Sequence, residues 1–134
     1  MLSKDKNWFE KFTIKKSTKK NAGKGVFTNV NIKKNEHIGY YTGKILNAKQ
    51  IERKPYSDSL FILQVTKNYY ILGEGKDSSF TSYINHSDKP NAQLVVSTRW
   101  KTARIVALEN IKKGEEIFYD YSNEYWDNLG KKPK

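Results

Sequence analysis

The sequence predicts a small, mainly β domain made of several short-stranded sheets. Its 134 residues are the length of one domain, which can bury a single core. Short runs of apolar, β-branched and aromatic residues recur along the chain, and polar segments of hairpin length separate them. Little of the sequence has the composition of a helix. We therefore expect one domain over residues 1–134, with its core at about 12–126, a loose arm up to about residue 10 and a frayed tail at 130–134.

The first part of the domain is expected to hold three strands and one short helix. Residues 12–16 alternate in polarity like a strand. A basic, glycine-containing loop at 17–25 opens into a second strand at 26–28, and a third strand is expected at 38–42. Residues 47–54 have the composition of one or two helical turns. These turns end near the following proline, because proline disfavours helical backbone at the residue before it.

The second part is expected to consist of hairpins and one ambiguous segment. Residues 60–65 and 69–72 are apolar and aromatic runs separated by a short polar segment, which predicts a hairpin. Residues 80–84 fit either a short helical turn or an extended piece, because periodicity does not distinguish the two over so short a length. Further strands are expected at 92–96, 103–108 and 117–119.

Composition excludes several kinds of site. The chain has no cysteine, so it has no disulfides, no thiolate zinc site and no cysteine nucleophile. Its two histidines, His37 and His86, have no neighbours at metal-ligand spacing, and we expect no metal. No run of apolar residues is long enough for a membrane helix, and the N-terminus lacks the apolar segment of a signal peptide. We therefore expect a soluble, intracellular protein that does not enter a membrane.

Charge is distributed unevenly over a chain whose formal net charge is +11. Through Lys54 there are fourteen Lys and Arg against four acids, whereas residues 109–127 hold six acids against two lysines. The basic part could contact DNA, RNA or an acidic protein, while the acidic stretch could face a basic peptide. A lysine-rich solvated surface without a partner explains the same pattern.

Four short motifs occur in a fixed order. Each alone is common, and a glycine pair before a strand is ordinarily a plain turn. Together they resemble the SET-domain protein lysine methyltransferases, in a compact form without zinc-binding flanking modules that is similar to SET proteins of large viruses and bacteria. The motifs are Gly23-Lys24-Gly25-Val26-Phe27, Tyr40-Tyr41-Thr42-Gly43, Asn85-His86-Ser87 followed by Pro90-Asn91, and Gly114-Glu115-Glu116-Ile117-Phe118-Tyr119-Asp120-Tyr121.

The resemblance implies a SET-domain fold whose C-terminal segment passes through a loop in a knot-like arrangement, beside Asn85. It also implies S-adenosyl-L-methionine as the cofactor. Asn85 would accept a hydrogen bond from the ammonium group of this cofactor, the main chain of His86 would pair with its adenine edge, and Trp126 would stack on the adenine. Trp126, with its neighbour Tyr125, could instead plug the core. The expected cofactor-binding residues are Gly23, Lys24, Gly25, Val26, Asn85, His86, Tyr121 and Trp126.

Three tyrosines carry the chemistry that the resemblance implies. Tyr121 is expected to be the catalytic tyrosine, Tyr41 a wall of the lysine channel, and Tyr119 the residue that favours monomethylation. Tyrosine suits such a channel, since its ring is apolar and its hydroxyl hydrogen-bonds an amine without adding charge. Ordinary core packing is the competing explanation in a chain with nine tyrosines.

The sequence therefore predicts an S-adenosylmethionine-dependent protein lysine N-methyltransferase. The expected substrate is a lysine in a basic peptide, with a histone tail favoured, and a histone substrate would place the protein in the nucleus or on chromatin. The basic part could also contact nucleic acid, and two copies could pair as a homodimer. Two alternatives remain: a catalytically silent SET module that binds peptide or nucleic acid, and an unrelated small basic β domain that binds RNA or DNA through exposed aromatics.

Overall fold

The computed structural model describes residues 7–59, 62–75 and 77–121, and it confirms the mainly β architecture. In this part of the chain the strands form two three-stranded and two two-stranded sheets. The strands are β1 (Phe12–Lys16), β2 (Lys24–Thr28), β3 (His37–Tyr40), β4 (Lys44–Leu46), β5 (Ile62–Thr66), β6 (Tyr69–Leu72), β7 (Asn85–His86), β8 (Ala92–Ser97), β9 (Thr102–Ala107) and β10 (Phe118–Tyr119). The helical elements are α1 (Ala48–Ile51) and the 3-10 turns η2 (Trp8–Glu10), η3 (Tyr56–Asp58) and η4 (Phe80–Tyr83).

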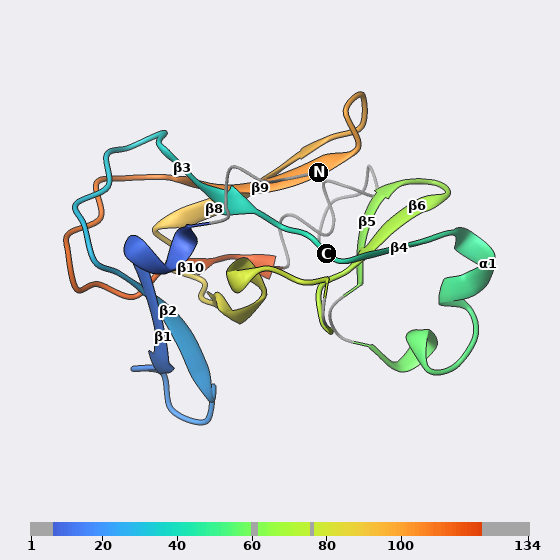
Figure 1. Cartoon of the computed structure of the whole chain (residues 1–134), viewed down its shortest axis with the longest axis horizontal. Helices are drawn as coiled ribbons and strands as arrows, with labels where there is room; N and C mark the ends of the chain where they lie inside the picture. The colour runs from blue at the N-terminus through green and yellow to red at the C-terminus, as the bar shows by residue number, and fades with distance from the viewer. Residues whose placement is uncertain (1–6, 60–61, 76, 122–134) are drawn as a thin grey trace.

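Antiparallel hairpins supply most of the sheet pairing, as expected. β1 pairs with β2, β5 with β6, and β8 with β9. β3 joins β9 to complete one three-stranded sheet, and β4 joins β6 to complete the other. In Figure 1 the β1–β2 hairpin projects at the lower left, whereas the β4–β6–β5 sheet and α1 lie at the right.

One expected strand ends early, and an unpredicted strand in another sheet follows it. The segment predicted as a strand at 38–42 leaves β3 after Tyr40, and the Tyr41 N–H donates to the Ala103 carbonyl at 2.8 Å. The chain then joins the other sheet at Lys44, which pairs with Leu72 in an unpredicted strand, β4. The sequence around this crossing does not show where the pairing partner changes from β9 to β6, which accounts for the error.

The two uncertain helical segments are both short. Asn47 caps α1 and forms a reciprocal capping box with Gln50, so the helix begins where the sequence predicted, although it ends at Ile51. The ambiguous segment at 80–84 is the helical turn η4, whose N-cap Ser79 accepts a hydrogen bond from the Thr81 N–H.

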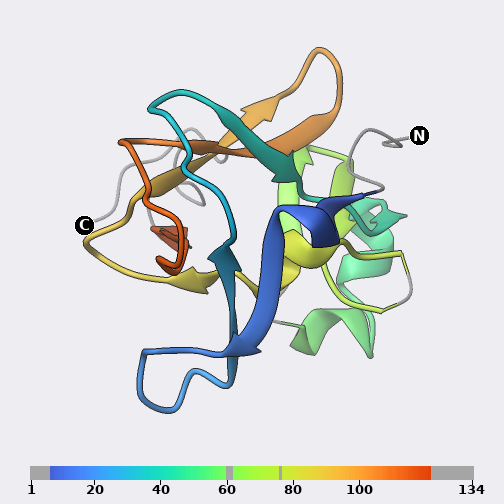
Figure 2. The ribbon, with the colours of Figure 1, turned by 60° about the vertical axis from the view of Figure 1, so that its left-hand side comes forward.

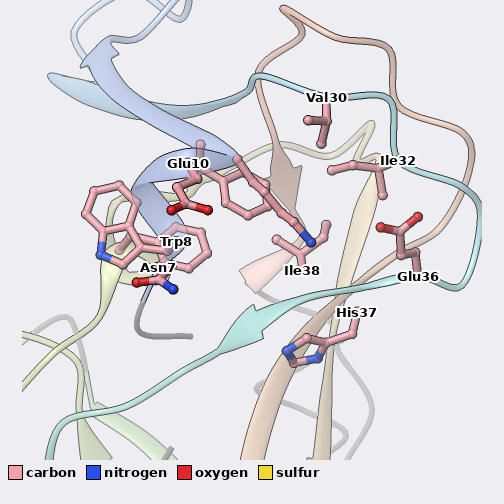
Figure 3. Close-up of a pocket in the computed structure, with 11 residues that line it drawn as sticks. Asn7, Trp8, Glu10, Val30, Ile32, Glu36, His37 and Ile38 are labelled. Carbon is pink, nitrogen blue, oxygen red and sulfur yellow. The ribbon is translucent and has the colours of Figure 1, made fainter. Parts of the chain in front are cut away.

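Part of the expected loose arm is ordered against the core. Residues 8–10 form η2, and the Trp8 ring stacks on Phe80 with ring centroids 5.2 Å apart. The sequence predicted an arm here because most of these residues are polar and charged. The stacking of Trp8 on Phe80 orders the segment instead. A pocket of about 240 Å³ lies between η2 and β3, and its lining includes Trp8, Glu10, His37 and Ile38 (Figure 3). It shares no lining residue with the site described below.

The core is continuous across the sheets and holds the C-terminal strand in place. β10 runs parallel to β7, with Phe118 opposite Asn85 and Tyr119 opposite His86. Figure 2 shows the orange-red segment that carries β10 beside the yellow segment that carries β7. The almost inaccessible side chains at the centre are Val26, Val65, Ile84, Ala92, Ala103, Ile105, Ala107, Ile111 and Ile117.

The pairing of β7 with β10 has a direct consequence for the site. It places Asn85 next to residues 118–121 although more than thirty residues separate them in the sequence, as the resemblance implied. No helix in the described part of the chain has the length and apolar character needed to cross a membrane.

Candidate active site

A buried carboxylate, Glu116, lies at the centre of the candidate site. Its side chain is 6% exposed and follows the turn at Gly114, just before β10. The Ser17 hydroxyl donates to one carboxylate oxygen at 2.7 Å, and the Thr18 hydroxyl and N–H donate to the other at 2.7 and 2.8 Å. The Asn85 side-chain amide adds a longer contact of 3.3 Å. Glu116 therefore joins the β1–β2 loop, β7 and the C-terminal segment.

The charge state of Glu116 follows from these contacts. Burial opposes ionisation, but the hydrogen bonds from Thr18, Ser17 and Asn85 stabilise the charged form and hold the pKa of the Glu116 carboxyl below its ordinary value. At neutral pH the group is thus an anion that accepts hydrogen bonds only.

This anion sets the orientation of the Asn85 side chain. The Asn85 amide nitrogen donates to the Lys24 carbonyl at 2.9 Å and to Glu116, and both of these partners can only accept. The nitrogen must therefore face them, which leaves the Asn85 side-chain oxygen as an acceptor. No described residue donates a hydrogen bond to that oxygen.

The Glu116 carboxylate also explains why residue 25 is a glycine. A Cβ at residue 25 would lie 2.1 Å from a Glu116 carboxylate oxygen and 3.1 Å from the Asn85 amide nitrogen. Only glycine lets strand β2 approach so closely. Its neighbour Val26 is fully buried, so Val26 can contribute to a surface site only through its main chain.

An open pocket of about 560 Å³ lies beside Asn85. Of the residues that the sequence assigned to the site, Lys24, Asn85 and Tyr121 line it together. Gly23 borders a neighbouring hollow instead. The other lining residues, which the sequence did not assign, are Ala22, Gly73, Glu74, Gly75, Ser78, Ser82 and Tyr83.

Tyr121 connects this pocket to a cluster of tyrosines. Its hydroxyl donates to the Ile84 carbonyl, and its ring lies 4.7 Å from that of Tyr119, centroid to centroid. Tyr121 is 40% exposed, yet burial of its hydroxyl end raises its pKa to about 12. Because the proton is retained and directed at Ile84, the Tyr121 oxygen can accept a hydrogen bond from another donor.

Tyr41 belongs to the same cluster. It is 7% exposed, and its pKa is raised by burial and by the nearby negative charges that Tyr121 and Glu74 would carry. Tyr119 is also 7% exposed. The three tyrosines thus meet around Tyr121, in surroundings that keep the hydroxyls of Tyr41 and Tyr121 neutral.

His86 supports the backbone of Tyr121. The Tyr121 N–H donates to the His86 imidazole Nδ1 at 3.1 Å, and the two rings lie 5.4 Å apart. The His86 carbonyl, expected to face the cofactor's adenine, accepts a hydrogen bond from the Lys19 ammonium. In this structure the side chain of His86 therefore positions Tyr121, and Lys19 contacts its main chain.

Trp126 and Tyr125 lie outside the described residues. Within the described part, no group of three or more His, Cys, Asp or Glu side chains is arranged to hold a metal ion.

Comparison with known proteins identifies the same region. A family model described as SET domain matches residues 23–122. A "Variant-silencing SET domain-containing protein" from Plasmodium falciparum (isolate 3D7) is 34% identical over 92% of this chain, and "Histone-lysine N-methyltransferase EZ1" from Zea mays is 30% identical over 77% of it. The matched regions span only 5% and 12% of those two proteins.

A solved structure shows the same fold. It is a humanized mutant of the Chaetomium thermophilum Polycomb Repressive Complex 2 bound to the inhibitor GSK126. The TM-score is 0.74 at 21% sequence identity, over 89% of this chain and 16% of that one.

The role of Glu116 makes a prediction about stability and pH. Glu116→Gln should lower the free energy of unfolding at pH 7 by about 1.5 to 3 kcal/mol, since charged hydrogen bonds become neutral ones. Because the folded-state pKa lies below the ordinary value, these bonds stabilise the fold above the ordinary carboxyl pKa of about 4.3, and that stability is lost as the pH falls through the folded pKa. Urea unfolding of both proteins between neutral and acidic pH measures the difference, which should shrink in acid.

The matched control is Glu115→Gln. Glu115 is exposed, and among the described residues its carboxylate accepts a hydrogen bond only from the neighbouring turn, at the Lys112 N–H. An equal loss of stability in both variants would contradict the special role assigned to Glu116.

Proposed function

The chain belongs to the SET-domain family, and we propose that it is an S-adenosylmethionine-dependent protein lysine N-methyltransferase. The observation that carries this proposal is the meeting of Asn85, oriented by Glu116, and Tyr121 in one pocket. Asn85 provides an acceptor for an ammonium group, and Tyr121 provides a neutral hydroxyl in the same pocket. The pocket volume also lies within the range usual for small-molecule sites.

The residues present fit the proposed cofactor. The side-chain oxygen of Asn85 is the acceptor that the cofactor's ammonium group requires, and the close approach of Gly25 leaves the β2 main chain near it. At His86, the Lys19 ammonium contacts the main-chain carbonyl that the adenine would approach. Lys19 must move if the adenine pairs with this carbonyl. Trp126 remains the proposed stacking partner.

When bound, S-adenosylmethionine supplies an electrophilic methyl group on a sulfonium. The protein's task is then to present a lysine as a free amine in line with that methyl, and alignment supplies much of the rate. A lysine has an ordinary pKa of about 10.4, which falls when the side chain is desolvated among apolar rings. We assign that surrounding to the rings of Tyr41 and Tyr119.

Tyr121 is the proposed catalytic residue. Since its own proton is directed at the Ile84 carbonyl, its oxygen can accept an N–H of the incoming amine. This contact orients the nitrogen lone pair without placing a negative charge beside it, which would favour the unreactive ammonium form.

The proposed substrate is a lysine in a basic peptide, and a histone tail is the favoured class. The relative from Zea mays is named as a histone-lysine methyltransferase, which supports this choice. Glu74 lines the pocket and is exposed, so it can attract a cationic side chain near Tyr121. A histone substrate would place the protein at chromatin.

Cofactor binding should depend on Asn85. Asn85→Ala removes an acceptor for a charged donor, so affinity for S-adenosylmethionine should fall by about 1.5 to 3 kcal/mol, or roughly 10- to 100-fold. Titration calorimetry measures it. Ser82→Ala is the control, because Ser82 lines the same pocket but its hydroxyl already donates to the Ser79 carbonyl at 2.9 Å. Absence of binding by the unmodified protein would argue against the enzyme and for a silent SET module.

Turnover should depend on the Tyr121 hydroxyl. Tyr121→Phe should keep cofactor affinity within a few-fold but slow methyl transfer about 100-fold, since the amine loses the contact that aligns it. Single-turnover transfer from labelled S-adenosylmethionine to a histone peptide measures the step. Tyr83→Phe, at another tyrosine of the same pocket, should retain near-normal rates. Equal rates for the unmodified protein and Tyr121→Phe would show that another residue orients the amine.

Product multiplicity should depend on Tyr119. Its hydroxyl, beside Tyr121, is proposed to restrict the space that a methylated amine needs to rotate, so the unmodified protein should stop mainly at monomethyl-lysine. Tyr119→Phe should yield di- and trimethyl-lysine, while Tyr40→Phe on β3 should not. Mass spectrometry of a limiting peptide taken to completion decides this, and abundant trimethylation by the unmodified protein would disprove it.

A further inference from the structure

The loop between β1 and β2, with the strand ends that flank it, concentrates positive charge beside the candidate site. Five lysines occur between positions 15 and 24, and all five are exposed; we call residues 15–24 the lysine loop. The loop projects with its hairpin on one side of the molecule (Figures 1 and 2). The loop is held to the core by Glu116, whose buried carboxylate accepts hydrogen bonds from Ser17 and Thr18.

The charges of the lysine loop are not neutralised by the part of the protein that the structure describes. No carboxylate within residues 7–59, 62–75 and 77–121 forms an ion pair with any of the five lysines. Lys15 lies over the Phe27 ring at 4.5 Å, and Lys19 contacts the His86 carbonyl. The ammonium groups of Lys16, Lys20 and Lys24 have no described partner, so an external anion can approach them.

The surface of the loop is hollowed, and the residues that line the hollow are lysines, other polar residues and one glycine. A hollow of about 540 Å³ is lined by four of these lysines together with Ser17, Thr18, Asn21 and Gly23. The main-chain N–H groups of Lys20, Asn21 and Gly23 donate to no described residue. Asn21 and Gly23 both have positive φ, at 65° and 70°, a backbone form that turns N–H groups toward bound anions.

We propose that the lysine loop binds the phosphate backbone of duplex DNA. Lysines act as point charges toward phosphates, and exposed N–H groups add donors. A protein partner fits less well, because protein interfaces are centred on apolar and aromatic anchors and this hollow has none. Single-stranded nucleic acid also fits less well, because base stacking requires aromatic side chains that the lining does not provide.

The location of the loop links this surface to the pocket. Lys24 lines both the hollow and the candidate active site. Bound DNA would therefore lie next to the methyl-transfer pocket. In this respect the inference rests on the proposed function. DNA binding by the lysine loop would select substrates whose lysine lies close to DNA, such as histone tails on a nucleosome.

DNA binding is measured on the full chain without S-adenosylmethionine, so a negative result leaves the methyltransferase proposal intact. The probe is a labelled duplex of about 20 base pairs, followed by fluorescence anisotropy over a series of salt concentrations. The test variant is K16Q/K20Q. The control K33Q/K113Q removes the same charge from exposed lysines on the turns at 33 and 113. Urea unfolding confirms that both variants are folded.

The expected result is salt-dependent binding that K16Q/K20Q weakens about tenfold or more near 0.1 M salt. The slope of log affinity against log salt should fall by roughly 2, since each phosphate contact contributes about 0.9. The control should lose little. Equal losses in the two variants would attribute binding to net charge alone and overturn the proposal. It would also be overturned by no binding at low salt, or by equally tight, loop-dependent binding of poly-glutamate, which would indicate an acidic protein partner.

Discussion

Four hydrogen bonds converge on the carboxylate of Glu116, which is almost completely removed from solvent. Leaving such a charge buried and unsatisfied costs more than the bonds themselves contribute, so its donors must be in place whenever the chain is folded. The donors come from the β1–β2 loop and from β7, and the acceptor precedes β10. The carboxylate therefore defines how three distant segments meet, and Asn85 takes its orientation from that meeting.

The tyrosine cluster depends on a second feature, the transfer of the chain between sheets after β3. Tyr41 stands at this crossing, where its N–H completes the β3–β9 pairing before the chain reaches β4. Its hydroxyl end reaches Gly73, where a Cβ would lie only 2.0 Å from the oxygen. Pairing of β7 with β10 brings Tyr119 and Tyr121 to the same place. The pocket thus lies where the passage from β3 to β4 meets the paired strands β7 and β10.

Local patterns predicted the hairpin at 60–72 and the start of the short helix well, because these are formed by residues close in sequence. They failed where pairing partners change, as at β4, and where one aromatic side chain orders a polar segment, as at Trp8. The motif resemblance anticipated that Lys24, Asn85 and Tyr121 would meet. It did not reveal the role of Glu116, whose partners Ser17 and Thr18 lie 99 and 98 positions away. The only local sign of this role was that Glu116 directly precedes the run at 117–119. That position does not show which residues donate hydrogen bonds to the carboxylate.

The central claim is that Glu116 acts on the cofactor site through Asn85, and a double-mutant cycle tests it directly. S-adenosylmethionine affinity is measured for the unmodified protein, Glu116→Gln, Asn85→Ala and the double variant. If Glu116 orients the Asn85 amide, the two losses overlap, and the double variant should bind more tightly than their sum predicts by about 1 kcal/mol. Losses that add to within about 0.3 kcal/mol would show that the two residues act independently and would contradict the account.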